Sequence, residues 1–270
     1  MTGGTWRRQV GVLLRATVAR SLLGRRAAPV FLLASMPVVL ALVRGLFPPG
    51  SERVGIASST AEFADIFHFF ILRFVVFVTT AVVFINLFRG EVVERSLHYT
   101  LLAPLPRRVL VAGRYLGGLV ATVLGLGPAT FLTFVLYFLP QMRNAPSILL
   151  VAPLPGQLLR WIAVLALACA AYGALFTLAG LQFSNPMLPV LLFLGWESLN
   201  PFLPAALKAV SVVHYLEGLT PVPPSVRAFA ILGRPPAPWA AVLGLALIVA
   251  LALWACTWRA RRIEITYGSD

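Results

Sequence analysis

The chain has 270 residues, of which 59% are hydrophobic and 11% charged, and its mean hydropathy is +0.89. Soluble domains carry roughly 25% charged residues, so this composition argues against a water-soluble domain, a coiled coil and a disordered chain. Basic residues number 22 against 9 acidic, a formal charge of +13. Both cysteines, Cys169 and Cys256, lie inside apolar runs, which disfavours a disulfide framework or a cysteine-rich metal site.

Long apolar segments divide the chain. A bilayer core of about 30 Å requires roughly 20 helical residues, and these runs lack the alternation of barrel strands. We therefore predict an all-α integral membrane protein with one transmembrane domain, in which residues 28–258 form a six-helix bundle. The predicted crossings are Ala28–Phe47, Ile66–Phe88, Val109–Leu139, Leu158–Gln182, Met187–Leu203 and Ala237–Trp258. The third is long enough to tilt or to break at Gly127-Pro128, and the fifth is short and interrupted by Glu197 and Asn200-Pro201.

Arginines are distributed unevenly around these crossings. Of the 22 basic residues, 14 fall in residues 1–27, in residues 89–114, or in the tail of residues 259–270. Basic residues accumulate in cytoplasmic segments, so we expect both termini and the link between the second and third crossings to be cytoplasmic. The charge then reflects membrane topology and not nucleic-acid binding. Residues 1–27 resemble an amphipathic interfacial helix more than a signal peptide; a solvated tail is the alternative.

The sequence contains neither the motif for nucleotide hydrolysis nor common catalytic motifs. A P-loop needs a lysine after glycine, and the only lysine, Lys208, follows Leu207. Neither a His-Glu-x-x-His pair nor a Gly-x-Ser-x-Gly elbow occurs. The histidines His68, His98 and His214 are far apart in sequence. We therefore expect that this chain is not an enzyme and holds neither a metal nor a cofactor of its own.

The link between the second and third crossings has a pattern of its own. It begins with acidic and basic residues, which are followed by leucines four residues apart on one helical face. Prolines then end the helical stretch just before two arginines. The residues of this pattern are Glu91, Glu94, Arg95, Ser96, Leu97, Leu101, Leu102, Pro104 and Arg107. The pattern predicts a short amphipathic helix beneath two membrane helices. A plain connecting loop is the alternative.

This link resembles that of the permease subunits of type 2 ABC exporters. The resemblance lies in Glu91, Ser96-Leu97, Leu101-Leu102, Pro104-Leu105, Arg107 and residues 112–116, and it extends to the layout of a basic arm and six crossings. Four residues depart from the family pattern. Arg95 stands at the usual glycine, Ser96 at the usual threonine, Pro106 at the usual serine and Arg114 at the usual lysine.

The resemblance implies a function and partners. The link would be a coupling helix seated in a groove of a separate ABC ATPase subunit, which binds ATP and Mg. A second permease half, identical or different, would complete the translocation path within the lipids of a bacterial inner membrane. The transported substrate is not indicated. Two other functions stay open from the residues alone: a structural or assembly subunit of a membrane complex, and a lipid-modifying membrane enzyme.

Polar residues inside apolar segments are candidates for the path. Arg73 and Glu197 lie at similar predicted depths in the outer half of the membrane, and Asn200 follows at the end of the fifth crossing. Because intramembrane charges usually face protein or a water-filled cavity, we predict that Arg73 and Glu197 face protein or the path, and the sequence leaves open whether they pair or share a polar patch. The alternative is that Arg73 reaches the headgroups while Glu197 is hydrogen-bonded at a helix break.

Two further patterns concern packing. Apolar residues in 205–219 recur at three- and four-residue spacing, which predicts a short helix dipping into the outer leaflet, as the family resemblance also suggests. Gly113, Gly117, Ala121, Gly125 and Ala129 form a stripe of small residues that permits close helix contact. We expect this stripe to pack within the chain, with a dimer interface as the alternative.

Overall fold

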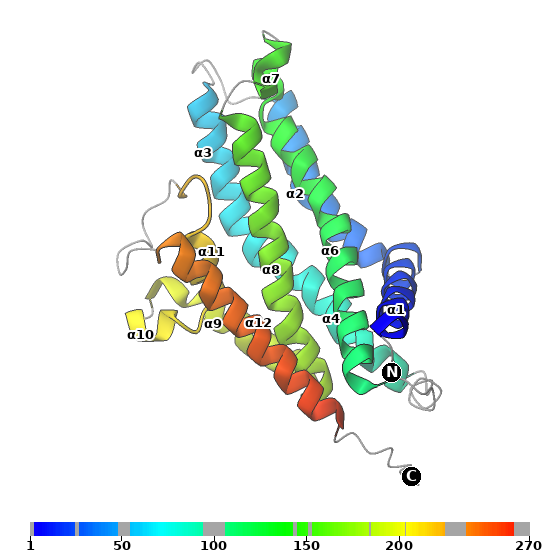
Figure 1. The fold of residues 1–270 in the computed structure, drawn as a ribbon. Coiled ribbons are helices and arrows are strands. Elements are labelled where there is room, and N and C mark those ends of the chain that lie inside the picture. The colour runs from blue at the N-terminus through cyan, green and yellow to red at the C-terminus, as the bar shows by residue number, and fades with distance from the viewer. Residues whose placement is uncertain are drawn as a thin grey trace.

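The computed structural model describes residues 3–24, 27–47, 55–93, 106–142, 145–150, 153–183, 185–202, 204–224 and 236–261, and every regular element in these ranges is helical (Figure 1). Five helices are long and apolar enough to span a membrane. They are Ala28–Leu46 (α2), Ile56–Leu87 (α3, η2 and most of α4), Arg107–Tyr137 (α6), Leu154–Gln182 (α8) and Pro238–Ala260 (within α12). The chain is therefore a helical, multi-pass membrane protein.

The other helices are shorter or lie beside this set. They are α1 (Gly3–Leu23), α7 (Leu139–Met142), η3 (Pro146–Leu150), α9 (Met187–Ser198), η4 (Asn200–Phe202), α10 (Ala205–Lys208) and α11 (Val212–Glu217). The second spanning helix consists of α3 (Ile56–Ile66), a π-helical stretch, η2 (Phe67–Val76), and α4 (Phe77–Val93), while α12 runs over Pro238–Arg261.

The helix at the place of the fifth predicted crossing is shorter than we expected. This helix, α9, has 12 residues and ends at Ser198, which gives a length of about 18 Å against a bilayer core of about 30 Å. The reason lies in Asn200-Pro201, because a proline disfavours the helical conformation of the residue before it. The prediction of six spanning helices is thus not confirmed: the described residues contain five, with α9 as a shorter apolar helix.

The second crossing begins earlier than predicted. We expected a start at Ile66, whereas the helix is continuous from Ile56. Its first turns are rich in polar residues, which lowered their apparent hydropathy. Their polar groups have partners: Thr60 donates to the carbonyl oxygen of Ile56, and Glu62 forms a two-point ion pair with Arg44 of α2 at 2.8 and 2.9 Å.

The third crossing is a single helix. α6 runs for 31 residues with Pro128 inside it, so of the two alternatives, a tilt or a break at Gly127-Pro128, the break does not occur. Its length is about 46 Å, which exceeds the bilayer core.

The interior of the bundle is built around α8. This helix contacts α4, α6 and α12 (Figure 1), and its Trp161 is fully buried against Phe63 and Phe67 at ring-centroid distances of 5.5 and 4.4 Å. A second aromatic group surrounds Tyr172, with ring contacts to Phe77, Phe176 and Phe193. These large apolar contacts hold the polar residues described below in a fixed frame.

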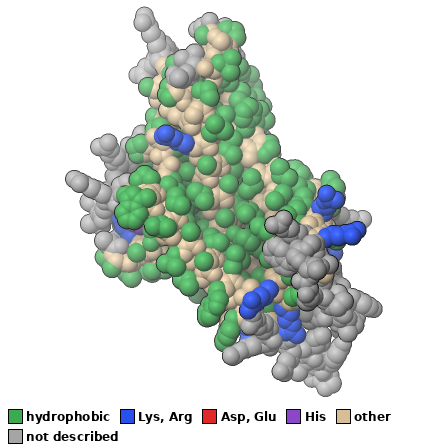
Figure 2. All heavy atoms as spheres, viewed as in Figure 1, with side chains coloured by type: hydrophobic (Ala, Val, Ile, Leu, Met, Phe, Trp, Pro, Cys, Tyr) green, Lys and Arg blue, Asp and Glu red, His purple; other side chains and the backbone are tan. Residues whose placement is uncertain are grey.

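The exposed faces of the helices are apolar over wide areas, as the green surface in Figure 2 shows. On α12, the exposed Trp239 and Trp254 lie 15 residues apart, about 22 Å along the helix. Tryptophan is enriched at both membrane boundaries, so this spacing is consistent with a spanning helix. The first helix, α1, and the last turns of α12 lie on the same side of the bundle, beside the start of α6 (Figure 1). We call this the arginine-rich end.

The small-residue stripe of α6 packs within the chain, as we expected. Gly113 lies against Leu13 of α1, and Gly117 lies against Thr17, so that α1 follows the first half of α6. Farther along, Gly125 meets Val30 of α2. The glycines therefore let α1 and α2 approach α6 closely.

A glycine substitution tests this packing. A β-carbon at Gly117 would lie 2.6 Å from Cβ of Thr17, whereas one at Gly127 meets nothing within 4 Å. We expect Gly117→Ala to lower the free energy of unfolding by about 1–3 kcal/mol through overpacking. Gly127→Ala, the matched control in the same helix, should be neutral or stabilise by about 0.5–1 kcal/mol. Thermal unfolding in detergent measures both; equal midpoints would contradict the α1–α6 contact.

Candidate functional site

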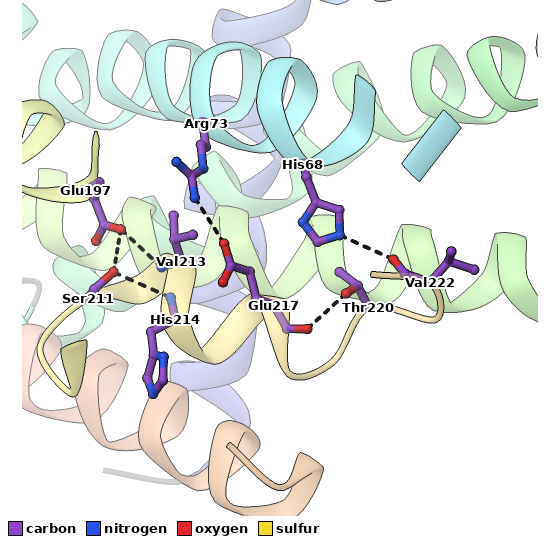
Figure 3. A network of polar contacts seen from close by, with 9 residues as sticks. All are labelled: His68, Arg73, Glu197, Ser211, Val213, His214, Glu217, Thr220 and Val222. Carbon is purple, nitrogen blue, oxygen red and sulfur yellow. Dashed lines mark hydrogen bonds and ion pairs between the residues drawn. The ribbon is translucent and has the colours of Figure 1, made fainter. Parts of the chain in front are cut away.

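A network of polar side chains joins the second spanning helix to the segment between α9 and α12 (Figure 3). Its strongest contact is an ion pair, in which Nη2 of Arg73 lies 3.0 Å from Oε1 of Glu217. Arg73 comes from η2, and Glu217 is the last residue of α11. Their side chains are 22% and 33% exposed, so the pair is partly shielded from solvent. The guanidinium of Arg73 also lies 5.7 Å from the ring centroid of Phe69.

Glu197 lies at the end of α9 and is hydrogen-bonded there, as the alternative to pairing expected. Its carboxylate accepts hydrogen bonds from Oγ of Ser211 at 2.8 Å and from the backbone nitrogens of Val212 and Val213 at 2.8 and 3.1 Å. These groups form the start of α11, where backbone N–H groups lack partners within the helix. Glu197 is only 3% exposed. It therefore caps α11, aided by the positive end of the helix dipole.

Of the two arrangements that the sequence left open, a direct pair of Arg73 and Glu197 does not form, because each charge has another partner. The two residues do belong to one polar network, since α11 binds Glu197 at its start and Arg73 at its end (Figure 3). The prediction used matched depths along two crossings. That argument failed because the second crossing starts ten residues earlier and because α11 supplies the partner for each charge.

His68 adds a further contact to the same segment. Its Nε2 lies 3.4 Å from the carbonyl oxygen of Val222, and Thr220 donates to the carbonyl oxygen of Glu217 at 2.9 Å. His68 and Arg73 are five residues apart in η2. Because π-helical hydrogen bonds join residues five apart, the π winding turns both side chains toward the same neighbouring segment. In an α-helix these two residues would point in widely different directions.

Glu217 is the residue that sequence reasoning missed. A signal was present, since Glu217 is one of only 9 acidic residues and closes the periodic stretch 205–219. Burial raises the pKa of the Glu217 carboxyl, while the Arg73 guanidinium acts in the opposite direction. In place of the single helix predicted at 205–219, the chain forms two short helices, α10 and α11. α11 packs against α8 and α12, and its last residue bonds to Arg73 of η2.

Asn200, the third predicted polar residue, lies in η4 and is 3% exposed. Its side-chain oxygen has no hydrogen-bond partner among the residues that the structure describes, and the hydroxyl of the fully buried Tyr172 has none either. The structure does not bring Asn200 into the ion pair of Arg73.

Most residues of the predicted coupling helix fall outside the described part of the chain. These are Glu94, Arg95, Ser96, Leu97, Leu101, Leu102 and Pro104. Glu91 belongs to the last turn of α4, where only the backbone is described. Arg107 begins α6, and its Nη1 donates to the carbonyl oxygen of Ala260 in α12 at 2.7 Å.

Arg114, about two turns farther along α6, is 5% exposed and donates to the carbonyl oxygen of Leu87 in α4 at 3.0 Å. Together with Arg107, it links three helices at the arginine-rich end. Ala260 lies in the last turn of α12, where carbonyl groups lack partners within the helix, so Arg107 supplies one. Leu87 lies inside α4, so the bond from Arg114 ties α6 to the body of that helix.

A comparison with models of known protein families found no match for this sequence, and a comparison with curated proteins found none. Within the described residues, no group of three or more His, Cys, Asp or Glu side chains is placed to hold a metal ion. The network around α11 consists of an ion pair, a helix cap and a histidine contact. This arrangement can fix the position of α11 against the second spanning helix.

Proposed function

We propose that this chain is the transmembrane permease subunit of an ATP-driven type 2 ABC exporter, which forms half of a translocation path and couples to a separate ATPase subunit. The observation that carries the proposal is the position of the 94–105 link. It connects the end of α4 to the start of α6, two long helices in direct contact, at the arginine-rich end. A link at this place, with the leucine pattern of a coupling helix, is suited to transmit movement into both helices.

The arrangement of the other helices supports the same proposal. In this proposal α9 and the folded-back α10–α11 segment together take the place of the fifth crossing and of the short outer-leaflet helix. The arginine-rich end then faces the cytoplasm with both termini, and α1 lies at the inner boundary of the membrane. ATP and Mg bind to the partner ATPase, and a second permease half completes the path between the two halves.

The introduction of negative charges into the link tests the proposal. The chain is co-expressed with a candidate ABC ATPase subunit, and ATP hydrolysis is measured in reconstituted vesicles. We expect Leu97→Asp with Leu101→Asp to abolish stimulation of the ATPase by the permease, because two carboxylates in an apolar contact are costly to desolvate. The five spanning helices should still assemble, as judged by size-exclusion chromatography and circular dichroism.

A matched control uses the other face of the same predicted helix. Tyr99 and Ala103 are also four residues apart and lie opposite Leu97 and Leu101 at helical spacing. Tyr99→Asp with Ala103→Asp should retain stimulation. If the Leu97 and Leu101 variant couples as well as the wild-type chain, or if both double variants lose coupling equally, the proposed coupling face is refuted.

A further inference from the structure

A cavity lies between α1, α4 and α6, at the arginine-rich end of the bundle. Its volume is about 90 Å³, and its polar lining comes from Arg20, Arg114, Asn86, Thr17 and Ser21. One water molecule needs about 10–15 Å³ by this measure, so the cavity can admit a group the size of a phosphate. Two of the five polar side chains are arginines, and no acidic side chain lines the cavity among the described residues.

The two arginines of the cavity differ in their exposure to solvent. Arg114 is 5% exposed and reaches the cavity from inside the bundle, while Arg20 lies on the exposed side of α1. Arginine presents five N–H donors in a planar fork that matches phosphate and carboxylate oxygens. A cavity lined by one buried and one exposed arginine therefore favours an anion with several oxygens.

A larger apolar groove adjoins the cavity. It has a volume of about 380 Å³ and lies between α4 and α9, with Phe77, Ile85, Val190 and Leu191 among its walls. Val82 and Asn86 line both the cavity and the groove. A small space lined by two arginines therefore borders a larger apolar one, and this order of polarity matches a molecule with an anionic head and a hydrocarbon chain.

The level of the cavity within the membrane fits such a molecule. Leu87, which lies six residues before the end of α4 at Val93, also lines the cavity. Arg114 lies seven residues into α6, about 10 Å from its start. This is the depth at which hydrocarbon gives way to the headgroup region, and basic pockets between membrane helices at this level bind anionic headgroups.

We propose that the cavity and the groove form one binding site for a phosphate-bearing lipid, with its headgroup between Arg20 and Arg114 and an acyl chain between α4 and α9. The site depends only on side chains of this chain. It stands whether or not the protein couples to an ATPase.

Lipid binding to the purified full chain tests the proposal. Native mass spectrometry in detergent counts bound lipids during titration with phosphatidylglycerol, and phosphatidylcholine with identical acyl chains serves as the comparison. We expect one phosphatidylglycerol to bind at least about tenfold more tightly than phosphatidylcholine, because charged hydrogen bonds are the stronger ones. Glycerol 3-phosphate and inorganic phosphate, added as competitors, separate recognition of the whole lipid from recognition of the phosphate alone.

Two pairs of variants locate the lipid. Arg20→Gln should weaken phosphatidylglycerol binding about tenfold, whereas Arg15→Gln removes the same charge from α1 outside the cavity and should have little effect. Leu191→Trp should fill the groove and reduce binding, whereas Leu192→Trp changes an equally exposed neighbour that does not line it.

Three results would overturn the site. The first is equal binding of both phospholipids, and the second is equal effects within each pair of variants. The third is displacement of the lipid by inorganic phosphate at similar concentration, which would show a simple anion pocket without a role for the groove. The proposal is supported if Arg20→Gln and Leu191→Trp lose binding while Arg15→Gln and Leu192→Trp retain it.

Discussion

Glu197→Ala is expected to release α11 from the bundle. The substitution leaves two backbone N–H groups and the hydroxyl of Ser211 without their acceptor in a buried site. Each unsatisfied buried donor costs about 1–3 kcal/mol, so we expect a loss of roughly 3–5 kcal/mol in the free energy of unfolding. Glu197→Gln keeps one acceptor oxygen and should lose less. Thermal unfolding in detergent gives the stability change.

Hydrogen exchange distinguishes this cap from a general loss of stability. The amides of Val212 and Val213 should exchange much faster in Glu197→Ala, while amides in the middle of α8 should stay protected. Ser198→Ala is the matched control, because the hydroxyl of Ser198 bonds only to the carbonyl oxygen of Leu194 in its own helix. Unchanged protection of α11 in Glu197→Ala would contradict the capping role.

The second prediction concerns the ion pair of Arg73 and Glu217. Removing either partner leaves a partly buried charge without its counterpart, so Arg73→Ala and Glu217→Gln should each cost about 1–3 kcal/mol in the free energy of unfolding. The double variant leaves neither charge. We therefore expect it to cost clearly less than the sum of the single changes, with a coupling energy of about 1 kcal/mol or more.

A second ion pair in the same protein supplies the control. Arg44 and Glu62 join α2 to α3, and their side chains are 17% and 39% exposed, close to the values for Arg73 and Glu217. Glu62→Gln combined with Arg73→Ala should be additive, because the two sites share no partner. Additive behaviour of Arg73→Ala with Glu217→Gln as well would exclude an energetically coupled pair.

Four of the predicted crossings agree with the structure to within a few residues. Segments such as Ala28–Phe47 and Ala237–Trp258 could be recognised because about 20 apolar residues in one run leave few alternatives. The second crossing was placed less well. Its first turns carry Ser59, Thr60 and Glu62, and their hydropathy gives no sign that α2 and α7 supply hydrogen-bond partners.

The polar network was predictable only in part. The sequence marks Arg73 and Glu197 as unusual because each is a charge inside an apolar run. It does not show which groups satisfy them, since both partners lie in α11, more than a dozen residues from Glu197 and 144 residues from Arg73. The ten-residue π stretch of η2 likewise has no recognisable pattern in the sequence, although it determines where His68 and Arg73 point.

The two arginine contacts at the start of α6 have a mechanical consequence. Arg107 holds the last turn of α12, and Arg114 holds α4 six residues before its end. A displacement of the first turns of α6 must then carry α4 and α12 with it or break a charge-assisted hydrogen bond. At this end the three helices are expected to move as one lever, and load applied to the 94–105 link is shared among them instead of bending α6 alone.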